Sequence, residues 1–365
     1  MAAYELSQVG NHFFVGLQPS PKLTDKDKEL LEALRPAGVV LFKSNFVHDV
    51  DYDSWLENHR RLINDIKEAV GRDRFLIATD HEGGRVCRTP NPITRFRSAA
   101  QWPHAAAQIG EAMGRELASL GLNMNFAPVL DVDSNPDNPV IGDRAFGSSP
   151  QGVGESGAAF TRAIQSQNVW ACGKHFPGHG DTDVDSHHAL PVLNLDRAQL
   201  NERELVPFDL AIRAGLELMM TAHIMFPKID PDLPATLSKT VTTGLLRETL
   251  GFEGVVLSDD IGMHAMDGYF ADGSAARQFM EAGNDVIMVC AHFTDTDRAL
   301  RLAASLVDEL ADDGFAKSFH EPSKERVDGL LSRTVMHDVC HLNDDVFATH
   351  REIAGVYEAK TVEVV

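Results

Sequence analysis

A run of 15 residues, from Lys174 to His188, holds one lysine, four histidines and three aspartates. Two glycines and a proline interrupt the run, and the short apolar segment 170–172 precedes it. We therefore expect a loop that follows the end of a buried strand. Loops held on a rigid scaffold often carry function. A loop this rich in groups that carry protons or charge favours a catalytic role over a passive surface role.

A metal site is the competing interpretation of this run, because clusters of histidine and aspartate bind metals. The spacing matches no compact ligand motif, since His187 and His188 are adjacent and would point apart. We therefore expect no metal and no cofactor.

Composition excludes several classes of protein. The chain of 365 residues is 43% hydrophobic, which is ample for a large core, and its formal net charge is −21. Such acidity argues against nucleic acid and against an anionic membrane as partners. No apolar run approaches the roughly 18 to 20 residues that cross a bilayer. We expect no membrane partner, and either a monomer or a small homo-oligomer.

Two features bear on the compartment. Residues 1–6 show no basic segment followed by an apolar one, so no secretory signal is evident. Cys87, Cys172, Cys290 and Cys340 are scattered without a CxxC pair, which suits a reducing environment. We expect a cytoplasmic protein.

Strand-like and helix-like segments alternate along the chain. Thr24 and Asp27 form a capping-box pattern that opens one helix, and Pro36 follows its end. Strands are expected at 12–17, 38–42, 75–80, 122–131, 170–172, 216–224, 254–259 and 285–289. Helices are expected at 24–34, 52–70, 99–120, 154–167, 195–214, 239–250, 274–282 and 294–310.

Eight strand–helix units in order predict an α/β fold, a single-domain (β/α)8 barrel of the TIM type. A doubly wound open sheet is the rival, but it usually has fewer strands and a switch-point loop. We assign residues 1–340 to the barrel and residues 341–365 to a helical, charged C-terminal tail.

Ionisable residues stand where the expected strands end. In such barrels the active site lies at the C-terminal ends of the strands. The strand ends concerned are Asp80, Asp131, Lys174 with His175, His223, and Asp259 with Asp260. An isolated terminal aspartate is more often a helix cap. Five such ends on one rim instead predict a polar pocket on the top face of the barrel.

The motifs around these strand ends occur together in a known family. They are Gly38–Asn45, Asp80-His-Glu-Gly-Gly-Arg-Val86, Asn125–Asp133, Ile141–Gly147, Lys174-His-Phe-Pro-Gly-His-Gly180, Asp185-Ser-His187, Ala222–His223, Pro234–Ser238 and Val256–Asp260. On these motifs the chain resembles family 3 glycoside hydrolases, and specifically the bacterial β-N-acetylhexosaminidase branch that acts in cell-wall recycling. The resemblance implies a carbohydrate substrate.

Two departures from the family pattern are visible. His81 stands where the family usually has glutamine, and residues 261–263 vary a loop that is more often Leu-Ser-Met. Neither departure touches a residue that is expected to do chemistry. His81 nevertheless adds a titratable group near the expected site.

Asp259 is the expected nucleophile. Glycoside cleavage with retention needs a nucleophilic carboxylate on one face of the sugar and a proton donor at the leaving oxygen. Asp259 ends an apolar strand, which would present it rigidly. Asp260 is the competitor, but strand alternation sends it to the opposite side, where it would cap a helix or bond to the loop. The resemblance also favours Asp259.

His187 is the expected proton donor. An imidazole with an ordinary pKa near 6.5 can protonate the leaving group and later take a proton from water. Asp185, two residues earlier, could hold one ring nitrogen and fix the tautomer, as the aspartate of a Ser-His-Asp triad does. The resemblance implies the same acid/base pair.

The resemblance also implies a set of sugar-binding side chains. They are Asp80, Arg88, Arg144, Lys174 and His175, with His223 on the pocket floor. Arg144 and Lys174 could equally be structural ion-pair partners of the many carboxylates.

Together these residues predict a metal-free exo-β-N-acetylglucosaminidase that removes terminal N-acetylglucosamine, with cell-wall muropeptides as its source. Three alternatives stay open. A histidine donor leaves no second carboxylate to repel phosphate, so a β-glycoside phosphorylase on the same fold fits too. A β-glucosidase is the second alternative. The third is a catalytically silent sugar-binding protein, against which the intact Asp259, Asp185 and His187 argue.

Overall fold

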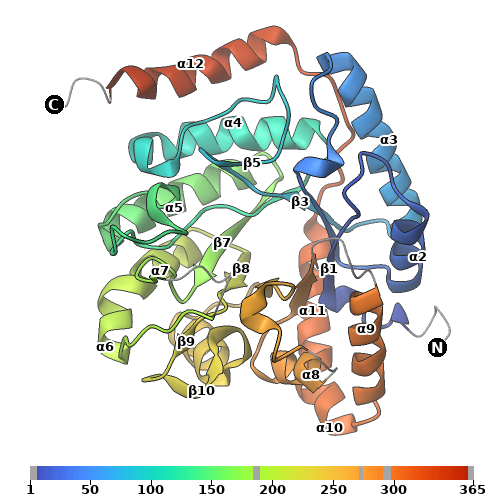
Figure 1. Cartoon of the computed structure of the whole chain (residues 1–365), viewed down its shortest axis with the longest axis vertical. Coiled ribbons are helices and arrows are strands. Elements are labelled where there is room, and N and C mark those ends of the chain that lie inside the picture. The colour runs from blue at the N-terminus through green and yellow to red at the C-terminus, as the bar shows by residue number, and fades with distance from the viewer. Residues whose placement is uncertain (1–5, 184–189, 271–273, 291–296, 361–365) are drawn as a thin grey trace.

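The computed structural model describes residues 6–183, 190–270, 274–290 and 297–360. Parallel strands form a closed barrel in chain order, and the first strand closes it by pairing with the last (Figure 1). The barrel strands are β1 (Phe13–Gly16), β2 (Gly38–Leu41), β3 (Leu76–Thr79), β6 (Met124–Asn125), β7 (Trp170–Phe176), β8 (Leu218–Thr221), β11 (Val255–Asp260) and β12 (Val286–Val289). This closed parallel barrel confirms the predicted fold.

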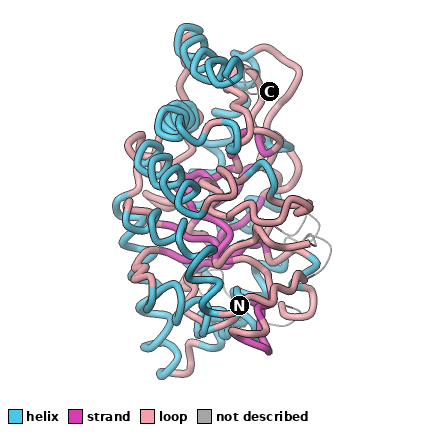
Figure 2. Tube along the Cα trace, turned by 90° about the vertical axis from the view of Figure 1, so that its left-hand side faces the viewer, coloured by secondary structure: helices cyan, strands magenta, loops and turns pink. Residues whose placement is uncertain are grey.

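Helices connect the strands and lie outside them, and loops gather on one side of the strand layer (Figure 2). The helices are α2 (Asp25–Leu34), α3 (Tyr52–Val70), α4 (Ala106–Ser119), α5 (Pro150–Gln165), α6 (Arg197–Gln199), α7 (Leu205–Arg213), α8 (Ser274–Glu281), α9 (Asp297–Glu309), α10 (Asp313–Phe315), α11 (Glu321–Arg333) and α12 (Asp344–Lys360). π-helical segments are Leu200–Glu204, Thr240–Thr249 and Ala316–His320. No helix among the described residues is both long and apolar enough to span a membrane.

Local sequence signals account for where these elements begin. The capping box before α2 is present: Asp27 N–H donates to Thr24 Oγ1 at 3.2 Å, and Thr24 N–H donates to Asp27 Oδ2 at 3.0 Å. Two short hairpins accompany the barrel, and one of them follows β3 directly. The hairpins are β4 (His81–Gly83) with β5 (Val86–Cys87), and β9 (Met225–Phe226) with β10 (Asp230–Pro234).

Alternate strand residues feed two apolar cores, as the two-residue period of a strand requires. Phe14 and Val40 point into the barrel, whereas Phe13 and Val39 pack in the layer between strands and helices. Leu330 of α11 belongs to the interior cluster. This helix therefore helps to close the amino-terminal end of the barrel and leaves the carboxyl end for a site.

The strand predicted at 122–131 is wrong in length, because β6 spans only Met124–Asn125. The Asn125 side chain accepts from the N–H of His81 at 3.0 Å and donates to its carbonyl at 2.9 Å, which ties the start of the hairpin to β6. Pro128 then lacks an N–H for the ladder. The apolar run stays buried and keeps irregular backbone bonds to β7, such as the one from Leu130 N–H to the Lys174 carbonyl at 2.7 Å.

The helix predicted at 99–120 is also interrupted. Short 3-10 turns at Ala99–Gln101 and Pro103–Ala105 precede α4. Pro103 cannot donate a backbone hydrogen bond, so a regular α-helix begins only after it.

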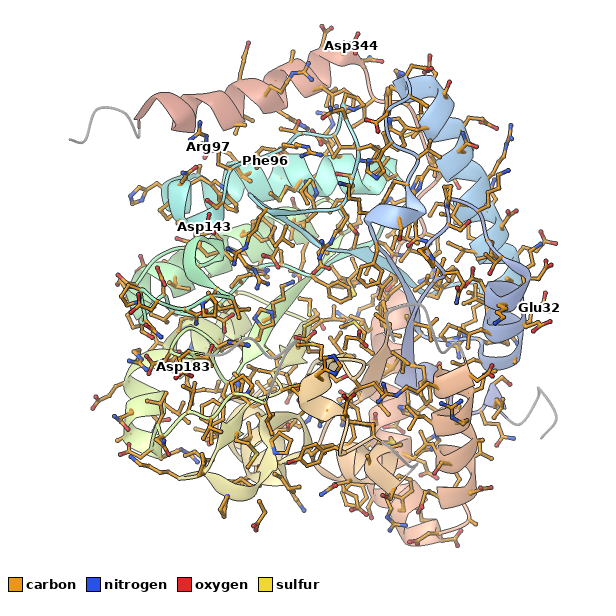
Figure 3. The ribbon with its side chains drawn as sticks, in the orientation of Figure 1. Glu32, Phe96, Arg97, Asp143, Asp183 and Asp344 are labelled. Carbon is orange, nitrogen blue, oxygen red and sulfur yellow. The ribbon has the colours of Figure 1, made fainter. Side chains whose placement is uncertain are left out.

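The C-terminal helix α12 packs against α4 (Figure 1). Phe347 is fully buried there, and His350 Nδ1 lies 2.6 Å from Glu116 Oε1. Acidic residues such as Glu32 of α2 and Asp344 at the start of α12 stand on the outside of the molecule (Figure 3).

Candidate active site

A cavity of about 320 Å³ opens at the carboxyl end of the barrel. Its charged or ionisable lining is Asp80, Glu82, Arg88, Arg144, Lys174, His175, His179, Asp259 and Asp260. Its apolar lining is Val40, Phe42, Val86, Phe126, Val140, Met220, Met263, Met288 and Cys290. The structure therefore brings together Asp259 and five of the six predicted sugar-binding residues, from strands far apart in the sequence.

Glu82 is a site residue that the sequence reasoning missed. It is 4% exposed and accepts from Arg144 through both oxygens, at 2.8 and 2.9 Å, while Lys174 Nζ lies 2.6 Å from its Oε1. Burial by itself would raise the pKa of Glu82, but the two cations outweigh it and lower that pKa far below its usual range. The sequence could have indicated Glu82, because this residue lies inside the Asp80–Val86 motif.

Asp80 shares the same cations. Lys174 Nζ donates to Asp80 Oδ1 at 2.9 Å, and an Arg88 nitrogen lies 3.6 Å from Asp80 Oδ2. Burial alone would lower the pKa of Lys174, but Asp80 and Glu82 together raise it above its usual value. Lys174 is therefore held as a cation against the cavity, and it is also an ion-pair partner. The structural ion pairs expected of Lys174 are present, and its role in binding a sugar stays a prediction.

His175 is oriented by a buried carboxylate. Its Nδ1 lies 2.7 Å from Asp131 Oδ2, and Asp131 also accepts from the backbone N–H of His179 at 2.7 Å. Since Asp131 engages Nδ1, Nε2 is the ring nitrogen available to a ligand in the cavity. Asp131 was expected on the polar rim, but it does not line the cavity and instead holds His175 in place. Burial, followed by the charge of His175, lowers the pKa of His179 to about 4.

The two aspartates that end β11 differ in their environment. Burial would raise the pKa of Asp259, but His175, Lys174 and the N–H of Asp260, which lies 2.8 Å from Asp259 Oδ1, lower it below the ordinary value. Burial, with the Asp259 charge adding to it, raises the pKa of Asp260. Asp259 is therefore the carboxylate kept ionised, as a nucleophile must be.

Asp260 is among the residues that line the cavity, together with Asp259. A register shift between β11 and β12 at these residues disturbs the strand alternation. The predicted bonds to the loop are present: Asp260 Oδ1 accepts from the N–H groups of Gly262 and Cys290, each at 2.9 Å. These bonds hold Asp260 as a structural support.

Two histidines lie behind the cavity. His223, expected on the pocket floor, is not among the lining residues; its Nδ1 lies 2.7 Å from Thr236 Oγ1, and its Nε2 is 3.2 Å from the Asp260 carbonyl oxygen. It therefore supports the end of β11 from below. The His81 side chain, expected near the site, is completely buried on the other side of the β4–β5 hairpin, next to Cys87.

The predicted acid/base pair, Asp185 and His187, lies outside the described residues. The loop that leads to it is anchored as far as Thr182. Arg203 donates to Asp181 Oδ2 at 2.7 Å, and Asn138 Nδ2 donates to the Gly180 carbonyl at 3.0 Å. Among the residues described, no group of three or more His, Cys, Asp or Glu could hold a metal ion.

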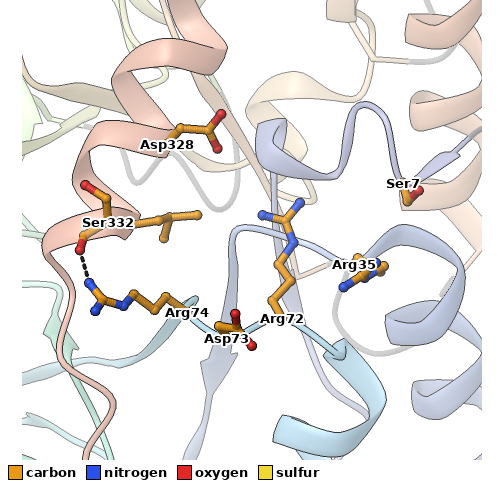
Figure 4. Close-up of a pocket in the computed structure, with 8 residues that line it drawn as sticks. Ser7, Arg35, Arg72, Asp73, Arg74, Asp328 and Ser332 are labelled. Carbon is orange, nitrogen blue, oxygen red and sulfur yellow. Dashed lines mark hydrogen bonds between the residues drawn. The ribbon is translucent and has the colours of Figure 1, made fainter.

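A second hollow, of about 680 Å³, opens at the amino-terminal ends of the strands (Figure 4). Arg35, Arg72 and Arg74 line it together with Asp73 and Asp328. Arg35 donates to the carbonyl groups that end α3, and Arg74 donates to the Ser332 carbonyl. These guanidinium groups cap helix C-termini, where positive charge is stabilising. We assign this hollow a structural role.

Comparison with known proteins decides the family. Residues 3–326 match the model of the glycosyl hydrolase family 3 N-terminal domain. The chain belongs to glycoside hydrolase family 3. This family 3 hydrolase is 38% identical over 298 residues to a β-hexosaminidase of Thioalkalivibrio sulfidiphilus, covering 79% of this chain and 82% of the relative.

Solved structures agree with this assignment. A family 3 β-N-acetylglucosaminidase from Paenibacillus sp. str. FPU-7 superposes with a TM-score of 0.83 and 33% identity, covering 95% of this chain and 67% of that one. NagZ from Neisseria gonorrhoeae in complex with N-trifluoroacetyl-D-glucosamine superposes with a TM-score of 0.75 and 28% identity, covering 95% of this chain and 98% of that one. The protein is a glycoside hydrolase, as the motifs predicted.

Proposed function

We propose that this family 3 hydrolase is a retaining exo-β-N-acetylglucosaminidase. The observation that carries the proposal is the position of Asp259, an ionised carboxylate that borders a cavity rich in hydrogen-bonding cations. A cavity of about 320 Å³ lies at the small end of the range for ligand pockets. Such a volume suits one sugar ring held at the end of a chain, which supports exo action.

The proposed mechanism has two steps, as in other retaining glycosidases. Asp259 attacks the anomeric carbon and forms a glycosyl ester, while His187 protonates the leaving oxygen. His187 then takes a proton from water, which hydrolyses the ester. Asp185 orients the imidazole. Lys174 and its neighbours donate hydrogen bonds that fix the sugar, and their ion pairs limit how far they can move.

The preference for N-acetylglucosamine rests on the relatives. The Paenibacillus structure is that of a β-N-acetylglucosaminidase, and the Neisseria structure holds an N-acylated glucosamine. We extend this specificity to the present chain as a proposal. A cytoplasmic setting and cell-wall muropeptides as the natural source follow from the sequence resemblance and belong to the same proposal.

Turnover of an aryl N-acetyl-β-glucosaminide against the matching aryl β-glucoside tests the specificity. We expect kcat/KM for the N-acetylated substrate to be at least about a hundredfold higher, because buried groups that bind the acetamide stay unpaired with the glucoside. The product should be the free sugar with or without phosphate. A sugar 1-phosphate would instead assign the phosphorylase, and a preference for the glucoside would assign a β-glucosidase.

His187→Ala tests the acid/base pair. Water needs a general base in the second step, whereas the first step needs no acid when the leaving group is highly activated. On an activated aryl glycoside we expect a burst, followed by slow turnover that azide restores. If His187→Ala slows activated and unactivated substrates equally, without burst or rescue, the proton donor is another residue.

A further inference from the structure

A cysteine–histidine pair lies on the side of the β4–β5 hairpin that faces away from the cavity. The two strands pair antiparallel with His81 opposite Cys87. Cys87 Sγ is 3.5 Å from His81 Nδ1 and 3.7 Å from Thr89 Oγ1. His81 is completely buried, whereas Cys87 is partly exposed. Cys87 is therefore a partly exposed residue whose sulfur has an imidazole fixed beside it.

This environment makes the Cys87 thiol a nucleophile near neutral pH. Burial would raise the pKa of Cys87, but His81, the Thr89 contact and the Arg95 charge lower it to about 6. Burial would likewise lower the pKa of His81, yet Cys87 and then Glu116 raise it. A thiolate paired with an imidazolium is the arrangement that activates cysteine nucleophiles.

The other cysteines lack this combination. Cys172 and Cys290 are buried, and burial raises the pKa of each thiol well above its usual range. Cys340 is exposed, but it lies beyond α11, far along the chain from the hairpin. Cys87 is therefore the cysteine that combines access with activation.

The position of Cys87 connects it to the sugar site. Its two chain neighbours, Val86 and Arg88, both line the cavity, and Arg88 lies 3.6 Å from Asp80. The buried side chains of His81 and Thr89 lie against one side of the sulfur. A group attached to Sγ would add bulk at the residue that directly precedes Arg88, and we expect Arg88 to shift with it.

We propose that Cys87 is a site of reversible modification by small disulfides, and that the modification weakens sugar binding in the adjacent cavity. The thiolate attacks one sulfur of the disulfide, whose S–S bond breaks as the new S–S bond to Cys87 forms. The other half leaves as a thiolate and takes a proton from water. A free thiol reverses the exchange. The effect on binding, though not the modification, rests on the proposed function.

Oxidised glutathione is the probe, applied to the full chain carrying Cys340→Ser so that the exposed thiol is absent. Mass spectrometry of the intact protein and its peptides should show one adduct, on Cys87, that dithiothreitol removes. The modification rate should rise with a midpoint near pH 6, in contrast to the ordinary value of about 8.5. His81→Gln should move this midpoint upward, because the imidazolium is lost.

Activity gives the second readout. The adduct should lower kcat/KM for the N-acetylglucosaminide by about tenfold, mainly through KM, as loss of a charged hydrogen bond would. Cys87→Ser should turn over normally and should not respond to the disulfide. An adduct on another cysteine, or a midpoint of the modification rate near pH 8.5, would refute Cys87 as the modification site. An adduct on Cys87 that leaves KM unchanged would refute the effect on sugar binding. Absence of glycosidase activity would defeat the proposed function but leave the mass result interpretable.

Discussion

At the scale of single residues, Glu82 links the cavity's cations. It holds Arg144 through two hydrogen bonds and Lys174 through an ion pair, and Lys174 also reaches Asp80. A cation that is fixed by buried carboxylates has little conformational freedom left to lose when it binds a sugar. The ion pairs therefore preorganise the donors.

Replacing the Glu82 carboxylate should expose this role. Glu82→Gln keeps the shape but removes the charge, which leaves Arg144 without its partner. Loss of one member of a buried ion pair costs about 3 kcal/mol of folding free energy, and we expect KM to rise. Urea denaturation and steady-state kinetics measure the two effects.

Glu57→Gln is a matched control. Glu57 forms ion pairs with Arg60 and Arg61, but at the surface of α3. Exposed pairs contribute little to stability, so this variant should unfold and turn over like the wild type. Equal stability of the Glu82 and Glu57 variants would contradict the preorganising role of Glu82.

At the scale of elements, the loop after β7 depends on close backbone packing. Gly180 lies against Val132, and a Cβ added at Gly180 would overlap the Val132 carbonyl oxygen. The carbonyl belongs to backbone and cannot turn away as a side chain would. Gly180 therefore permits the close approach of the described loop segment 178–183 to the backbone of Val132.

Gly180→Ala should displace this loop. Overpacking of this kind costs about 2 kcal/mol of stability, and turnover should fall because the loop leads to His187. Gly152→Ala in α5 is the control, since the nearest atom to its new Cβ lies 3.5 Å away. Thermal unfolding measures the stability of both variants, and kcat measures their turnover. Wild-type turnover in Gly180→Ala would show that the loop tolerates displacement.

The sequence predicted the elements that local signals specify. β2 and β3 were predicted because near-continuous apolar runs mark strands covered on both faces. β6 was overestimated, since the chain turns after Asn125, where Ala127 N–H donates to the Asn125 carbonyl at 2.8 Å, and only irregular bonds to β7 continue beyond it. The ion pair between Arg144 and Glu82 joins residues 62 positions apart, and no local period reports such a contact. The register shift between β11 and β12 near Asp260 could not be predicted, because register is a property of the paired strands.

At the scale of the whole molecule, the tail helix is fastened to the barrel layer by a buried cluster. Glu116 of α4 accepts from the backbone N–H of Thr94 at 2.7 Å and from the Thr94 hydroxyl at 2.6 Å. His350 Nδ1 of α12 lies 2.6 Å from Glu116 Oε1. The described part of the tail that was predicted at residues 341–365 thus contributes contacts to the stability of the barrel.

His350→Ala should therefore destabilise the entire molecule. Removing a buried partner of a charged group costs about 2 kcal/mol of folding free energy. The protein should still unfold in one cooperative transition, at a lower temperature than the wild type. Arg351→Ala, at the exposed neighbouring position, should change stability by less than about 0.5 kcal/mol. Calorimetry measures both. An unchanged transition in His350→Ala would show that α12 unfolds separately from the barrel.

In the proposed mechanism, Asp259 forms the covalent intermediate. A 2-fluoro sugar with a good leaving group slows both steps, so that the glycosyl enzyme accumulates and can be digested and sequenced by mass spectrometry. We predict one sugar per chain, attached to Asp259, and no label in Asp259→Asn. A label on Asp260, or turnover by Asp259→Asn at the wild-type rate, would contradict it.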